Sequence, residues 1–141
     1  MTGFLLDTNV VSEAVKKTPA VNVANWFKTV PDDLLFISVI TLGEIRRGIV
    51  LQPLVPRRMQ LELWLRQQVQ AQFKGRILHV DEHVADRWGT VTAEARLKGR
   101  PLPQMDALLA ATALHHNLTL VTRNTKDVSL TGVSLVDPWE A

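Results

Sequence analysis

The sequence contains no cysteine among its 141 residues. Disulfide bonds, thiolate zinc sites and a cysteine nucleophile are therefore excluded. No apolar run approaches the roughly 20 residues needed to span a bilayer, and the first residues lack the basic segment and long apolar core of a signal peptide. The chain also lacks internal repeats, low-complexity segments and linkers. We expect one domain over residues 1–141, located in the cytoplasm and not in a membrane.

The composition is that of an ordinary globular protein, with 46% apolar and 21% charged residues and a net charge of +2. The positive charge is concentrated in the middle of the chain, at Arg46, Arg47, Arg57, Arg58, Arg66, Lys74 and Arg76. Such a local excess can face a phosphate backbone. It is equally typical of the solvated faces of helices, so both interpretations stay open.

Short apolar runs alternate with amphipathic stretches along the whole chain. Strands are predicted over residues 3–6, 34–38, 76–80, 118–122 and 133–136. Helices are predicted over 9–16, 20–30, 39–51, 56–73, 82–98 and 103–116. This alternation indicates a three-layer α/β/α domain with a central parallel sheet of about five strands.

The first apolar run ends on a carboxylate, Asp7. A charged group at the carboxyl end of a strand lies where open α/β folds build their sites. Asp is also a preferred N-cap residue, so Asp7 alone could simply cap the following helix.

Three further acids occupy comparable places. Glu44 lies among apolar residues of a predicted helix, Asp106 in the first turn of an Ala/Leu-rich helix, and Asp127 shortly after the fourth predicted strand. Carboxylates gathered at one sheet edge would repel one another unless a cation joined them. Mg²⁺ or Mn²⁺ suits oxygen ligands of this kind and can support hydrolysis of a phosphodiester. The helix dipole alone could also account for Asp106.

Four segments together resemble the PIN-domain ribonucleases, particularly the VapC-type toxins of type II toxin–antitoxin pairs and their FitB-like branch. They are residues 5–12 (LLDTNVVS), 38–48 (SVITLGEIRRG), 105–113 (MDALLAATA) and 120–124 (LVTRN). The ending at 133–139, with Asp-Pro-Trp, is also similar. Each motif is weak by itself, but the resemblance spans nearly the whole chain in the expected order.

The resemblance implies a PIN-like fold and a metal-dependent endoribonuclease that hydrolyses RNA at a carboxylate-held Mg²⁺ or Mn²⁺ site. Asp7 and Asp106 match direct metal ligands, and Glu44 matches the acid that holds metal-bound water. Thr8 matches the hydroxyl of the first motif, and Asn9 matches its amide, which is expected to orient Asp7 or a ligand water.

The segment after the fourth strand departs from part of the family. Some relatives have Asp where this chain has Asn124, whereas others combine Asn with an acid three residues later, the position of Asp127. The resemblance therefore leaves two candidates, Asn124 and Asp127, to complete the site. We favour Asp127 as the source of charge, with Asn124 and Thr122 positioning water.

The family also implies partners. They are an RNA substrate, a cognate antitoxin that alone would bind operator DNA, and a second copy in a homodimer. We interpret Trp64, with Leu61 and Leu65, as a dimer or antitoxin contact. The pairs Arg46/Arg47 and Arg57/Arg58 are expected to hold the RNA backbone. The histidines are interpreted as surface or capping residues.

Three alternatives stay open from the sequence. A phosphoacceptor receiver module would use Asp81 after the third strand, but it leaves Glu44 unexplained. A small phosphatase of the haloacid dehalogenase class would start from Asp7, but Asn9 stands where its general acid belongs. The third is a pure interaction protein with an inert site.

Overall fold

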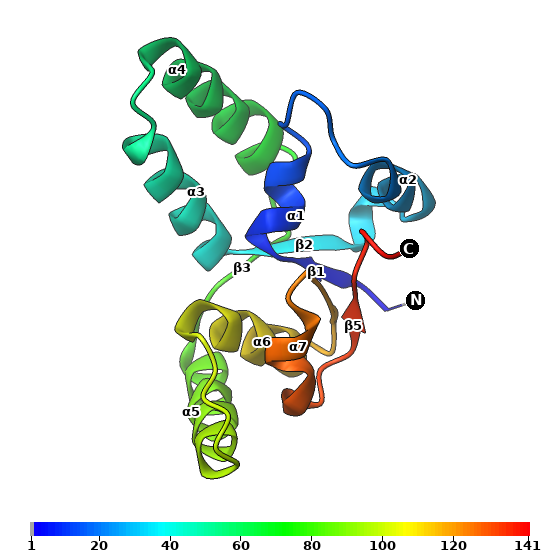
Figure 1. Ribbon diagram of the computed structural model, residues 1–141, viewed down its shortest axis with the longest axis vertical. Coiled ribbons are helices and arrows are strands. Elements are labelled where there is room, and N and C mark those ends of the chain that lie inside the picture. Colours follow the sequence, from blue (N-terminus) through cyan, green and yellow to red (C-terminus); the bar gives the residue numbers. More distant parts are fainter. Residues whose placement is uncertain (1) are drawn as a thin grey trace.

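The computed structural model describes residues 2–141 as three layers, with a parallel sheet between two groups of helices (Figure 1). The strands are β1 (Phe4–Leu6), β2 (Leu35–Ser38), β3 (Ile77–Leu78), β4 (Thr119–Val121) and β5 (Leu135–Val136). They follow the order β3-β2-β1-β4-β5, and every neighbouring pair is parallel. The predicted α/β class and five-stranded parallel sheet are confirmed.

The strands are apolar at consecutive positions because both faces of the sheet are covered. Successive side chains of a strand point to opposite faces. Accordingly, Leu6 belongs to the core on one side of the sheet and Leu5 to the core on the other, and both are almost completely buried.

One face is covered by α1 (Thr8–Glu13), α2 (Val21–Thr29), α3 (Val39–Leu51), α4 (Val55–Trp64) and the π-helical continuation η2 (Leu65–Gln70). The other is covered by α6 (Gln104–His116) and α7 (Thr125–Val128), with α5 (Glu82–Leu97) packed against α6. Two short 3₁₀ turns, η1 (Asp32–Leu34) and η3 (Ser129–Thr131), complete the chain. Among residues 2–141, no helix has the length and apolar character required to cross a membrane.

The structure differs from the predicted elements in two places. The single helix expected over 56–73 is α4 followed by the wider π-helical turn η2. The segment after β4, expected to be a loop, contains the four-residue helix α7. The predicted end of α6 is confirmed: Asn117 adopts the left-handed conformation (φ 55°) that a C-terminal cap requires.

Candidate active site

The candidate site lies where the strand order reverses. The chain runs from β1 outward to β2 and β3 and then returns to the opposite side of β1 as β4. Open α/β sheets bind their ligands at the carboxyl ends of the strands beside such a reversal. Asp7 follows β1 at this edge, and Thr122 follows β4.

The Asp7 carboxylate is held by β4 and does not cap α1. Its side chain makes no capping hydrogen bond, whereas its backbone oxygen accepts from the amides of Val10 and Val11. The Thr122 hydroxyl donates to Asp7 Oδ2 over 2.8 Å, and both residues are buried. Asn9, which was expected to orient Asp7 or a ligand water, is exposed and makes no hydrogen bond to Asp7 in the described part of the chain.

Glu44 is positioned by the start of α3 and by the residue after Asp7. The Ser38 hydroxyl caps α3 by accepting from the amide of Ile40 over 3.0 Å. Two turns into this helix, Glu44 Oε1 accepts a hydrogen bond of 2.5 Å from the Thr8 hydroxyl. The Thr41 hydroxyl, fully buried, lies 3.3 Å from that of Thr8. Sequence reasoning gave Thr41 no role, because only the fold places it beside Thr8.

Asp106 lies in the first turn of α6, close enough to the other three acids to be affected by their charges. Its pKa is raised from 3.8 to about 6 by burial first, and then by the negative charges of Asp7, Asp127 and Glu44. A nearby carboxylate raises the pKa of another because two like charges repel. The acids predicted from four separate segments therefore lie close enough to affect one protonation equilibrium.

The segment after β4 contributes through three residues in different ways. Thr122 is buried and bonded to Asp7, as described above. Asn124 is exposed at the start of α7, and its backbone amide donates to the Thr122 hydroxyl over 3.1 Å. Asp127, on α7, is exposed but near enough for its charge to act on Asp106. Which of Asn124 and Asp127 completes the site stays a prediction.

This donor set fits a hard divalent cation. Within residues 2–141, no group of three or more His, Cys, Asp or Glu side chains is arranged to hold a metal ion directly. Mg²⁺ needs only one or two direct carboxylates, because waters fill the rest of its shell. Burial is the main cause of the raised pKa of Asp106, and the negative charges of Asp7, Asp127 and Glu44 add to it. A bound cation would offset these charges.

The predicted basic residues separate into different environments. Arg46 forms a bidentate ion pair with Glu62 of α4, and this pairing lowers the pKa of Glu62. Arg57 donates a hydrogen bond to the backbone oxygen of Val15 over 3.3 Å. Arg47 is exposed beside Glu44 in a groove and forms no ion pair among the described residues. Of the predicted pairs, Arg47 is therefore the best placed to meet a phosphate near the acids.

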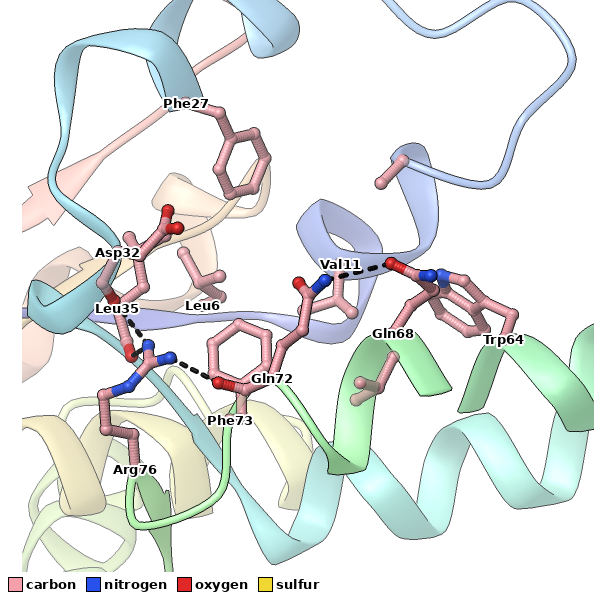
Figure 2. A pocket seen from close by; sticks show the side chains of 12 residues that line it. Leu6, Val11, Phe27, Asp32, Leu35, Trp64, Gln68, Gln72, Phe73 and Arg76 are labelled. Atoms are coloured by element: carbon pink, nitrogen blue, oxygen red, sulfur yellow. Dashed lines mark hydrogen bonds between the residues drawn. The ribbon is translucent and has the colours of Figure 1, made fainter. Parts of the chain in front are cut away.

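Another cavity, of about 690 Å³, has none of the four acids of the candidate site in its lining (Figure 2). Trp64 and Gln68 lie along one side of it and Phe27 and Asp32 along another, while Arg76 donates to the backbone oxygen of Leu35 over 2.6 Å.

The dimer or antitoxin contact predicted for Trp64, Leu61 and Leu65 is wrong for one of its three residues. Leu65 is only 2% exposed and belongs to the core, so it cannot contact a partner.

The receiver-module alternative does not fit the arrangement of the acids. Asp81 follows β3, which lies at one edge of the sheet, and its side chain caps α5 by accepting from the amide of Val84 over 2.9 Å. The histidines His83 and His115 stack near this cap, with ring centroids 5.4 Å apart and exposed side chains. Their place agrees with the predicted surface and capping roles.

Comparison with known proteins gives consistent matches over nearly the whole chain. The PIN domain family model matches residues 4–130. The sequence is 34% identical to "Toxin FitB" of Neisseria gonorrhoeae over 136 residues, which are 96% of this chain and 98% of that protein. It is 32% identical to "VapC ribonuclease Y4jK" of Sinorhizobium fredii over 137 residues, covering 97% of this chain and 98% of that protein.

A solved structure agrees with these sequence matches. The crystal structure of FitAcB from Neisseria gonorrhoeae superposes with a TM-score of 0.94 at 33% identity, covering 98% of this chain and 99% of that one.

Proposed function

Because this chain belongs to the PIN domain family, we propose that it is the toxin of a VapBC-type toxin–antitoxin pair and acts as a Mg²⁺- or Mn²⁺-dependent endoribonuclease. The observation that carries the proposal is the placement of the acids: Thr122 after β4 holds Asp7, Thr8 holds Glu44, and Asp106 lies near enough to Asp7, Glu44 and Asp127 to be affected by their charges. The names of the two relatives, a toxin and a ribonuclease, support the biological assignment.

The side chains take distinct roles in this proposal. Asp7 and Asp106 would hold the metal, with Glu44 completing its surroundings. A bound Mg²⁺ or Mn²⁺ would activate a water and offset charge on the phosphoryl oxygens. Thr122 fixes the orientation of Asp7 through its 2.8 Å hydrogen bond. Thr8 fixes Glu44 by donating to Oε1, and Oε2, which forms no hydrogen bond among residues 2–141, would orient the attacking water.

The reaction is hydrolysis of an RNA phosphodiester. Water attacks phosphorus, the bond from phosphorus to the 3′ oxygen breaks, and the leaving oxygen takes up a proton. No side chain forms a covalent intermediate, so the absence of cysteine is no obstacle. The carboxylates contribute by placing charge and orienting water in advance of the reaction.

We also propose the partners that such a toxin requires. They are a cognate antitoxin, which alone would contact operator DNA, and a second copy of this chain in a homodimer. We further propose that it acts in the cytoplasm, together with its RNA substrate. A short neighbouring reading frame that encodes a DNA-binding protein would support the antitoxin assignment, and co-expression of the two should relieve growth arrest.

The test is a cleavage assay on the purified chain with Mg²⁺, Mn²⁺ or EDTA. We expect metal-dependent cleavage of RNA by the wild type and none by Asp106→Asn. Asp33→Asn is the matched control, because Asp33 is an exposed acid at the opposite end of β2 from the site. Equal circular dichroism spectra would show that both variants fold. Undiminished activity of Asp106→Asn, freed of contaminating nuclease, would contradict the proposal.

A further inference from the structure

The segment that follows β5 is fixed to the rest of the fold at three points. Before it, β5 pairs with β4, and the amide of Thr122 donates to the backbone oxygen of Val136 over 3.0 Å. The Asp137 carboxylate then accepts a hydrogen bond of 2.9 Å from the amide of Trp139. The Asn22 side chain donates to the backbone oxygen of Trp139 over 2.8 Å, so this segment lies beside α2 (Figure 1). The backbone that carries the indole of Trp139 is therefore held in place.

The indole of Trp139 stacks on the guanidinium of Arg123. The guanidinium carbon Cζ lies 4.6 Å from the ring centroid, which is a cation–π arrangement. Arg123 is exposed and forms no salt bridge among residues 2–141. Its charge adds to the lowering of the pKa of Glu13, which hydrogen bonds from Lys16 and the Ala20 amide lower first. Trp139 is thus the partner that fixes the direction of the Arg123 side chain.

Arg123 is the middle residue of the turn 122–124, which supports the candidate site. The Thr122 hydroxyl donates to Asp7 Oδ2 over 2.8 Å and accepts from the amide of Asn124 over 3.1 Å. One hydroxyl therefore joins this turn to a carboxylate that would hold the metal. Because both hydrogen bonds depend on the backbone of the turn, the hydroxyl keeps its orientation only while the turn keeps its conformation. Trp139 holds this turn from outside the site, through Arg123.

We propose that Trp139 is a positioning residue for the metal site. By stacking on Arg123 it fixes the turn 122–124, and through the Thr122 hydroxyl it fixes the orientation of the Asp7 carboxylate. The role requires neither Trp139 nor Arg123 to touch the metal or the RNA. This inference rests on the proposed function, because it assigns a support to the metal site of that ribonuclease.

The charge of Arg123 gives the test a definite sign. A cation near a site for Mg²⁺ or Mn²⁺ repels the metal, so its removal would by electrostatics alone strengthen metal binding. Loss of a positioning contact has the opposite effect, because the Asp7 carboxylate then spends part of its time in orientations that do not ligate. Arg123→Gln should therefore weaken metal binding although it removes a positive charge.

The first measurement is binding of Mn²⁺ to the metal-free protein without RNA, followed by electron paramagnetic resonance of the free ion. Arg123→Gln and Trp139→Leu should each raise the dissociation constant by about three- to tenfold, less than the loss typical of a group bonded directly to a metal ligand. Trp139→Phe keeps an aromatic ring against the guanidinium and should stay within about twofold of the wild type. Arg123→Gln leaves the apolar packing of Trp139 in place, so the test holds even if Trp139→Leu does not fold.

The matched control is Phe73→Leu, which removes the ring of another cation–π pair. The Cζ atom of Arg76 lies 5.0 Å from the centroid of the Phe73 ring, and Phe73 lines the cavity that contains none of the four acids. Phe73→Leu should lower the melting temperature and leave the affinity for Mn²⁺ unchanged.

The second measurement asks whether the effect passes through Thr122. Thr122→Val alone should weaken Mn²⁺ binding, and Arg123→Gln added to it should cause little further loss, because changes along one path are not additive. In the cleavage assay, excess Mn²⁺ should restore most of the rate of Trp139→Leu, since that variant lacks affinity for the metal and not the catalytic groups.

Failure of this inference and failure of the proposed function give different results. Unchanged or tighter Mn²⁺ binding by Arg123→Gln would overturn the positioning role and leave the ribonuclease standing, and so would a full additional loss in the Thr122→Val background. Mn²⁺ binding that weakens in Arg123→Gln and Trp139→Leu, without RNA cleavage by the wild type, would support the positioning role and contradict the proposed function. Absence of Mn²⁺ binding by the wild type would contradict both.

Discussion

Replacing Asp106 by asparagine should stabilise the metal-free protein at neutral pH, although the same change should abolish cleavage. Burial and the charges of Asp7, Asp127 and Glu44 raise the pKa of Asp106 from 3.8 to about 6. The native state therefore keeps a proton that the unfolded chain has already lost at pH 5. Because the native state binds more protons, the free energy of unfolding of the wild type falls as the pH rises through this interval.

The magnitude follows from the size of this shift. A shift of roughly 2 pH units corresponds to about 3 kcal/mol, and solvent screening at this half-buried side chain reduces it to about 1.5 kcal/mol. An anion in the first turn of a helix gains about 0.5 kcal/mol from the helix dipole, which asparagine gives up. The variant should therefore be more stable by about 1 kcal/mol above pH 7, or about 3 °C in melting temperature for a chain of this size.

The assay is urea denaturation in EDTA between pH 4 and pH 8. The advantage of Asp106→Asn should be absent near pH 4, should grow up to about pH 6 and should stay constant above pH 7. Asp33→Asn, the exposed control, should show no such profile. An Asp106→Asn variant that is less stable than the wild type at pH 7.5, or a pH-independent difference, would refute the reasoning.

Two further predictions test contacts of the site. Thr122→Val should lower the free energy of unfolding by about 1–3 kcal/mol, because it leaves the buried Asp7 Oδ2 without its hydrogen-bond donor. Urea denaturation measures this change, and an unchanged free energy of unfolding would show that the bond is unimportant. Arg47→Ala should weaken RNA binding and lower the slope of log affinity against log salt by about 1. Arg46→Ala should change that slope little, because Glu62 already engages its guanidinium, and equal effects of the two variants would contradict this distinction.

The five strands could be predicted because each is marked by a short apolar run that is visible in the sequence itself. Strands buried on both faces have short apolar runs, and each run lies between helical segments with a different period. The π-helical turn η2 was missed, because the apolar spacing of 56–73 continues through it without a break. The helix α7 was missed because four residues are too few to show helical periodicity.

The acids of the candidate site could be proposed from the sequence, whereas the hydrogen-bond partners that hold them could not all be identified. Asp7 follows a strand, Asp106 lies in the first turn of a helix, and Glu44 lies among apolar residues inside a helix, and all three positions could be predicted from the sequence pattern. The partner of Asp7 is different: Thr122 is 115 positions away, and only the parallel pairing of β1 with β4 brings it to hydrogen-bonding distance. The amide of Asn9, two residues after Asp7 in the first motif, was the expected candidate for this role, but its position on α1 leaves it exposed.

The groove beside Glu44 illustrates a second limit. The sequence shows two glycines inside a predicted helix, which by itself indicates only a weakened helix. The structure adds that both lie on the face that carries Glu44 and that nothing packs over them.

The central claim is that the carboxylates hold a metal-dependent centre at which water cleaves RNA. Cleavage in water enriched in ¹⁸O, followed by mass spectrometry of the fragments, tests this claim most directly. Attack by water with departure of the 3′ oxygen predicts a 3′-hydroxyl on one fragment and a 5′-phosphate carrying one heavy oxygen on the other, only with Mg²⁺ or Mn²⁺ and not in Asp106→Asn. Fragments that end in a 2′,3′-cyclic phosphate, formed equally in EDTA, would contradict it.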